Sequence, residues 1–76
     1  MAKAYVKIRV RPGKEMSVRD RLRAISTVRS ADLIAGQQDI IAVIEAEKGE
    51  DLFEFVVGKI RKIDGIEETI TNLVLE

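Results

Sequence analysis

The segment Ala35-Gly36-Gln37-Gln38-Asp39 has the residue types and spacing best suited to recognition chemistry. A glycine lets a ligand approach backbone N–H and C=O groups closely, and a carboxylate three residues later could hold an α-amino group. An ordinary turn between two strands would use the same residues, with glycine for a left-handed position and polar side chains across the sheet end. Residue types alone favour the ordinary turn over the ligand loop.

The residues needed for most catalytic and metal sites are missing from this chain of 76 residues. It has no cysteine, which excludes a disulfide framework, a thiolate metal site and a cysteine nucleophile. It has no histidine, which excludes a catalytic triad and a histidine-ligated zinc site. The pair Glu67-Glu68 lacks metal-ligand spacing and is expected to be a solvated strand start. We therefore expect no catalytic residue, no metal site and no cofactor.

The charge is balanced in total but uneven along the chain. Lys and Arg number 13, as do Asp and Glu, which weakens the case for nucleic-acid binding. Residues 1–30 carry nine basic side chains against Glu15 and Asp20, a charge of +7, so the remainder carries −7. This split fits either a basic arm or complementary surfaces that pair across neighbouring strands and across subunits. The second interpretation is favoured. In it, Lys7 and Arg9 would lie near Glu45 or near the acidic residues of the last predicted strand.

The chain contains neither a membrane-length apolar segment nor an apolar signal core at its start. No stretch rich in Pro, Gly or Ser suggests a linker. These features predict one cytoplasmic domain over residues 1–76 that does not contact a membrane.

Hydropathy patterns predict four strands and two helices. Apolar and polar residues alternate from Ala4 to Val10, and Pro12-Gly13 ends that strand. In the second helix, acidic residues begin and basic residues end the segment, as suits the helix dipole. The expected elements are a strand at 4–10, a helix at 14–25, strands at 28–35 and 40–44, a helix at 50–62 and a strand at 66–75.

The order β-α-β-β-α-β is an internal repeat. An offset of 38 positions pairs Ala4 with Ala42, Val6 with Ile44, Val18 with Val56, Leu22 with Ile60, Arg23 with Arg61, Ile25 with Ile63 and Val28 with Ile66. Right-handed crossovers then place both helices on one face of a four-stranded antiparallel sheet, which is the ferredoxin-like α+β fold.

The other face of that sheet is expected to be covered by a second copy. In the run 40–44 the residues of both parities are apolar, and Ile70 and Leu73 repeat this pattern on strand four. One apolar set would face water in a monomer. We therefore expect a homodimer in which two sheets pack face to face, a dimeric α/β sandwich.

Four segments together resemble the effector-binding domain, also called the RAM domain, of the Lrp/AsnC transcription regulators. They are AYVKIRV at 4–10, GQQDII at 36–41, KIRKIDGI at 59–66 and ETITNLV at 68–74. The resemblance implies sheet-mediated dimers assembled into octamers or decamers that bind amino acids or similar metabolites between dimers. It also implies a unit without its helix-turn-helix, which does not contact nucleic acid directly and acts with full-length Lrp/AsnC regulators.

The resemblance also implies site residues. The family's ligand loop falls on Gly36, Gln37, Gln38 and Asp39, with Asp39 as the partner of the ligand amino group and backbone N–H groups near Gly36 as partners of its carboxylate. The strand-four residues that influence effector response fall on Thr69, Thr71, Asn72 and Leu73.

Two alternatives to an effector-binding module remain. One is a module of the same fold that only oligomerises. The other is a small enzyme of the dimeric ferredoxin-like barrel type, which the lack of histidine and the few aromatic residues disfavour. A buried polar cavity inside each monomer would support the enzyme.

Overall fold

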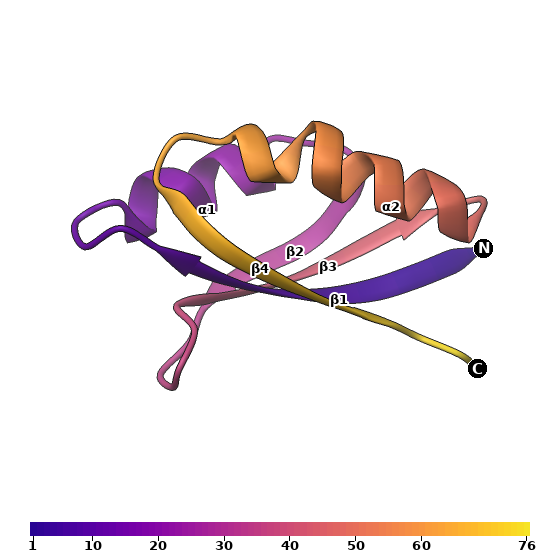
Figure 1. The fold of residues 1–76 in the computed structure, drawn as a ribbon, viewed down its shortest axis with the longest axis horizontal. Coiled ribbons are helices and arrows are strands. Elements are labelled where there is room, and N and C mark those ends of the chain that lie inside the picture. The colour runs from indigo at the N-terminus through magenta and orange to yellow at the C-terminus, as the bar shows by residue number, and fades with distance from the viewer.

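The computed structural model describes residues 1–76 and confirms the predicted element order. The elements are β1 (Ala2–Val10), α1 (Glu15–Arg23), β2 (Val28–Leu33), β3 (Ile40–Ala46), α2 (Gly49–Gly58), the 3-10 helix η1 (Ile60–Lys62) and β4 (Ile66–Leu73). The strands form one antiparallel sheet in the order β2-β3-β1-β4. Both helices lie on the same side of it (Figure 1), so the fold is the ferredoxin-like α+β arrangement.

The core lies between the helices and one face of the sheet. Alternate residues of the two central strands point to this face, because successive side chains in a strand point to opposite sides. The core side chains are Ala4, Val6, Ile8, Val10, Val18, Leu22, Val28, Ala31, Ile40, Ala42, Ile44, Leu52, Val56, Ile60 and Ile63. No polar or charged side chain is buried with them.

The predicted C-terminal end of the second helix, residue 62, is wrong. The α-helix stops at Gly58, and Lys59 has a φ of −121° and a ψ of −57°, outside helical geometry. Glycine is a weak helix former, so this is where the chain changes to the tighter η1. The predicted basic last turn is therefore absent from α2, because Lys59, Arg61 and Lys62 lie beyond it.

The other element ends shift by a few residues. The first strand begins at Ala2 instead of Ala4, α1 covers Glu15–Arg23 instead of 14–25, and β3 continues to Ala46. The strands β2 and β4 each end two residues earlier than expected. The N- and C-termini lie at the same end of the sheet (Figure 1), and the Val74 N–H donates to the Lys3 carbonyl oxygen at 2.9 Å.

The face of the sheet away from the helices is open and partly apolar. The strand register places Tyr5 of β1, Ile41 and Val43 of β3 and Ile70 of β4 on this open face. Tyr5 is 38% exposed and Ile70 is 40% exposed. The prediction that an apolar set on strand three faces away from the helices is confirmed.

Ion pairs join the basic first part of the chain to the acidic remainder. Five of the six pairs do so: Arg9–Glu68, Arg11–Asp64, Lys14–Asp64, Arg23–Asp32 and Arg29–Glu45. The predicted contact between strand one and the strand-four acids is thus found, whereas Glu45 pairs with Arg29, at 2.7 Å. Because these side chains are solvent-accessible, each pair contributes little stability. Neither α1 nor α2 has the length and the apolar composition that a membrane-spanning helix requires.

Gly65 fixes the β1–α1 loop against the start of β4. It has a φ of +102°, and its carbonyl oxygen accepts a hydrogen bond from the Arg11 N–H at 2.7 Å. A Cβ at this position would lie 2.9 Å from the Cβ of Lys14 and 3.2 Å from Val18 Cγ2. Only glycine satisfies both the backbone conformation and the packing.

We predict that Gly65→Ala lowers the free energy of unfolding by about 1 to 3 kcal/mol, the usual cost of a strained backbone position. Urea denaturation of the two proteins measures this difference. The control is Gly58→Ala, where nothing lies within 4 Å of the added Cβ, and a gain of up to about 1 kcal/mol is expected from helix propensity. Equal losses in both variants would contradict the prediction.

We expect the ion pairs of Asp64 to make a contribution to stability that depends on pH. A hydrogen bond from Lys14 and the charges of Lys14 and Arg11 hold its pKa below the usual 3.8. A lowered pKa in the folded state means that the contribution is present above about pH 4 and is lost as the pH falls further. The difference in unfolding free energy between the wild type and Asp64→Asn should thus be larger at pH 7 than at pH 3 in urea titrations. An equal difference at both pH values would contradict this.

Candidate functional site

A groove on the helix side of the sheet separates α2 from β4. The helix α2 packs on β1 and β3, and η1 lies against β4. The edge strand β4 is not among the strands on which α2 mainly packs. The register pairs Thr71 with Val6 and Leu73 with Ala4, so both side chains point to the helix side and into the groove.

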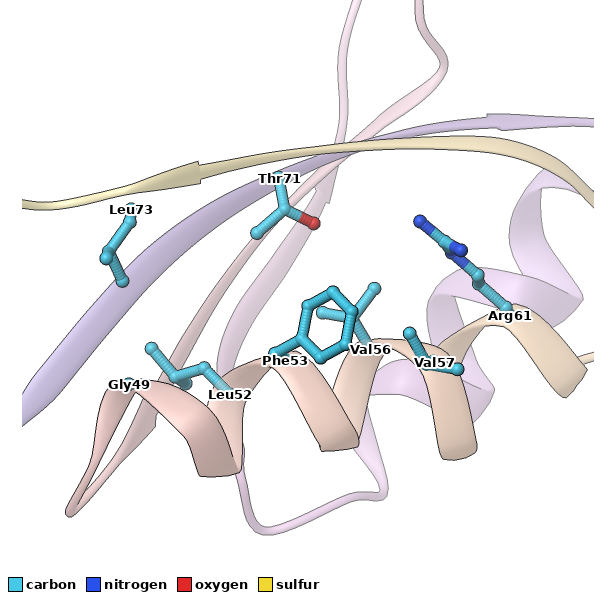
Figure 2. A pocket seen from close by; sticks show the side chains of 8 residues that line it. All are labelled: Gly49, Leu52, Phe53, Val56, Val57, Arg61, Thr71 and Leu73. Carbon is cyan, nitrogen blue, oxygen red and sulfur yellow. The ribbon is translucent and has the colours of Figure 1, made fainter.

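The groove is an apolar hollow of about 370 Å³. Its lining residues are Gly49, Leu52, Phe53, Val56, Val57, Arg61, Thr71 and Leu73. Figure 2 shows the apolar side chains of α2 facing Thr71 and Leu73 of β4, with Arg61 at one end. Leu52 and Val56 are 2% exposed and form the floor, whereas Phe53, 69% exposed, and Leu73, 52% exposed, form the rims.

Arg61 places a cation at the end of the groove. Its Nε donates to the Thr69 hydroxyl at 3.2 Å, which orients the guanidinium across the gap between η1 and β4. No carboxylate lies within 4.0 Å of Arg61; Arg21 is the other arginine without one. A guanidinium has five N–H donors, so its two terminal nitrogens remain available.

A second, more polar hollow continues beyond Arg61. It is about 310 Å³ and is lined by Arg61, Ile66, Glu67, Glu68 and Thr69. The Glu68 carboxylate lies 3.6 Å from Arg9, whereas Glu67 has no ion-pair partner. The guanidinium therefore stands between an apolar groove and a free carboxylate.

Asp39 joins the β2–β3 turn to the end of β1. Its Oδ2 accepts a hydrogen bond from the Val10 N–H at 2.8 Å, and its own N–H donates to the Ile8 carbonyl oxygen at 2.9 Å. The backbone pairing of β1 with β3 ends at Ile8, so the carboxylate supplies an acceptor that the sheet no longer offers. The sequence did not indicate this structural role. The other carboxylate oxygen, Oδ1, makes no hydrogen bond within the chain.

The other residues of the turn, 36–38, have backbone N–H groups that are not used within the chain. The backbone N–H groups of Gly36, Gln37 and Gln38 donate to no group of the chain. Nothing lies within 4 Å of the position that a Cβ on Gly36 would occupy. Figure 1 shows the turn projecting from the sheet on the side away from the helices.

The predicted site residues lie in three places. Gly36, Gln37, Gln38 and Asp39 form the projecting turn, while Thr69, Thr71 and Leu73 lie on the helix side of β4. Asn72 is on the open face, opposite Tyr5. One chain does not bring these groups together, because the turn and the groove lie on opposite sides of the sheet.

The sequence interpretation missed Arg61 and Phe53 as groove residues. The sequence pattern predicts Arg61 at the end of a helix, whereas the structure places it in η1, where it donates to Thr69. Phe53 and Val57 are four residues apart, beside the buried stripe of Leu52 and Val56. This second apolar pair on an otherwise one-sided helix was the available signal. No group of three acidic side chains is placed to hold a metal ion.

Comparison with known proteins identifies this type of domain. Residues 3–76 match the family model of the Lrp/AsnC ligand binding domain. The HTH-type transcriptional regulator LrpA of Pyrococcus abyssi is 39% identical over 66 residues, covering 87% of this chain and 47% of the relative. The chain thus spans about half the length of the curated relatives it matches.

Solved structures share the fold over almost the whole chain. The crystal structure of FFRP-DM1 is 32% identical with a TM-score of 0.95, covering 99% of this chain and 100% of that one. The complex of the transcriptional regulator NMB0573 from Neisseria meningitidis with L-Met is 17% identical with a TM-score of 0.85, covering 99% of this chain and 50% of that one, and shows the fold alone. The chain belongs to the Lrp/AsnC family, and residues 3–76 are its ligand-binding domain.

Proposed function

We propose that this domain binds an amino acid as an effector, oligomerises, and acts in transcription regulation without a catalytic role. The observation that carries the proposal is an apolar groove closed by an unpaired guanidinium in a domain of this family. A carboxylate and an apolar side chain are what such a groove is suited to hold. The L-Met bound by NMB0573 supports the same class of ligand.

The open face of the sheet supports a homodimer. Tyr5, Ile41, Val43 and Ile70 supply its apolar side chains, and Lys7 lies among them, opposite Ile41 on one side and Ile70 on the other. Packing two such faces would remove these side chains from water. This arrangement leaves the groove accessible, because the groove lies on the opposite side of the sheet.

Association of dimers would allow the turn of one chain and the groove of another to contact the same ligand. Since one chain holds them on opposite sides of its sheet, a site that uses both needs two chains. We propose that dimers assemble into an octamer or decamer with effectors between them, and that full-length Lrp/AsnC regulators are partners. In this arrangement the free N–H groups of Gly36 to Gln38 would bind the part of the ligand that projects from the neighbouring subunit.

A purely oligomerising module is the main alternative. It would need the open face but not the groove, and it gives no reason for an unpaired Arg61 beside apolar side chains. For the barrel-type enzyme, the supporting observation would be a buried polar cavity, and the buried side chains here are all apolar.

We predict that at least one amino acid with an apolar side chain raises the melting temperature in a thermal-shift screen of the twenty amino acids. Ligand that binds only the folded state adds about 2.7 kcal/mol of stability at one hundred times its Kd. Asp39→Asn should retain the fold and weaken the effect if the Asp39 carboxylate contacts the ligand amino group. No stabilisation by any amino acid would favour the oligomerisation module.

If two sheets pack face to face, size-exclusion chromatography with light scattering should give the mass of a dimer at micromolar protein concentration. Ile70→Lys, in the open face, should shift this mass toward the monomer because a charge would be buried in the interface. Met16→Lys is the control, since Met16 is 62% exposed on α1. A wild-type monomer, or an unchanged mass for Ile70→Lys, would contradict the dimer.

A further inference from the structure

We infer that Lys7 makes the open face of the sheet selective for its partner, and that this face binds most tightly to a second ferredoxin-like sheet that presents a carboxylate opposite Lys7. The inference rests on the proposed function in taking the open face to be the dimer interface. It adds the residue that determines which chain binds there and the chemistry that this chain must carry.

Lys7 lies in the middle of the apolar part of the open face. It is near the centre of β1, which is one of the two inner strands of the sheet. The register pairs it with Ile41 of β3 and with Ile70 of β4, so an aliphatic side chain lies on each side of it. A second sheet packed on this face would therefore enclose the Lys7 ammonium group in an apolar centre.

Lys7 has no charged or polar partner within the chain, in contrast to the other cations on the same face of β1. Because alternate residues of a strand share a face, these cations are Lys3 and Arg9. The Nζ of Lys3 lies 5.4 Å from the centre of the Tyr5 ring, which is a cation–π distance, and Arg9 pairs with Glu68 at 3.6 Å. No carboxylate lies within 4.0 Å of the Lys7 ammonium, and its side chain donates no hydrogen bond.

The carboxylates of the open face are already engaged with other groups. The strand register places three of them on this face, and each forms an ion pair with an arginine of its own chain: Glu45, Asp32 and Glu68. At the end of the sheet, Asp39 accepts the Val10 N–H. An identical second copy thus offers Lys7 no unpaired carboxylate on its strands, and it adds a second Lys7 to the same interface.

The charge of Lys7 therefore opposes packing against an identical face. The ammonium group loses its water when the faces close, and it gains no partner in return. A carboxylate at the facing position would supply a charge-assisted hydrogen bond and remove the like charge. The apolar side chains favour the packing of any similar face, whereas Lys7 favours an acidic one over a basic one.

The test compares dimer dissociation constants, measured by sedimentation equilibrium, for the wild type, Lys7→Met and Lys7→Glu. Lys7→Met should dimerise at least about tenfold more tightly than the wild type, since it removes the buried charge and keeps an apolar side chain. An equimolar mixture of the wild type and Lys7→Glu should likewise associate at least about tenfold more tightly than the wild type alone. With one protein isotope-labelled, native mass spectrometry should find more heterodimer than the half that random exchange gives.

Lys62→Met and Lys62→Glu are the matched controls. Lys62 is an exposed lysine of η1, in the helix layer, and it has no ion-pair partner. Both variants should dimerise as the wild type does, and Lys62→Glu mixed with the wild type should give the random half of heterodimer. Because Lys7 is exposed in the single chain, its variants should keep the wild-type circular dichroism spectrum.

Two outcomes would overturn the inference. One is an equal dissociation constant for the wild type and Lys7→Met together with random exchange, which means that the ammonium reaches water past the edge strand β4; the homodimer of the proposed function then stands. The other is a monomer in every sample, which overturns the homodimer as well. If the wild type is monomeric but Lys7→Met dimerises and the mixture with Lys7→Glu forms a heterodimer, the inference stands and the homodimer fails.

Discussion

The structure depends on the burial of one face of β1 and β3 beneath two short helices. Ala4, Val6 and Ile8 lie at the centre of this core, opposite Ala42 and Ile44 on the neighbouring strand. Both helices lie on the same side of the sheet, with α1 on β2 and β3 and α2 on β1 and β3. The opposite face is therefore open, and the edge strand β4 is only partly covered on the helix side. Both surfaces that are assigned a role follow from this placement of the helices.

Hydrogen bonding at the strand ends determines the shape of the candidate site. Where β1 runs past its partner β3, the Asp39 carboxylate replaces the missing backbone acceptor for Val10. Where β4 begins, Gly65 accepts from Arg11, and Asp64 lies near Lys14. The contacts of Gly65 and Asp64 fix the turn that joins η1 to β4, and the hydrogen bond from Arg61 to Thr69 spans the same two elements.

The fold could be predicted from the sequence because its signals are local and repeated. Alternation in β1 and the helical spacing of Val18 and Leu22 both reflect one buried face, and the repeat of 38 residues ties the halves together. The break after Gly58 was missed because the apolar spacing of Val56, Ile60 and Ile63 continues through it. All three are buried, although Ile63 lies outside any helix.

The candidate site was harder to predict, because tertiary folding places α2, η1 and β4 around the groove and no local pattern shows this. Whether Thr71 and Asn72 share a face with the turn depends on which side of the sheet the turn leaves, and adjacent residues point to opposite faces. The structural role of Asp39 depends on the point at which β1 extends beyond its pairing with β3. No local sequence pattern indicates this point. The resemblance to a family supplied the positions of the turn and the strand, but not the groove, for which the only local signal is the pair Phe53 and Val57 beside the buried stripe of α2.

The neighbouring termini have a practical consequence for handling the molecule. Both lie at one end of the sheet and the 36–39 turn at the other, separated along β1 by nine residues or ~30 Å. A fluorophore, affinity tag or surface linker attached at either terminus would leave the turn unobstructed. It would, however, lie close to Leu73 at the groove mouth, since Leu73 pairs with Ala4 near the start of β1. Immobilisation through an end therefore suits experiments on assembly through the turn better than those on ligand entry.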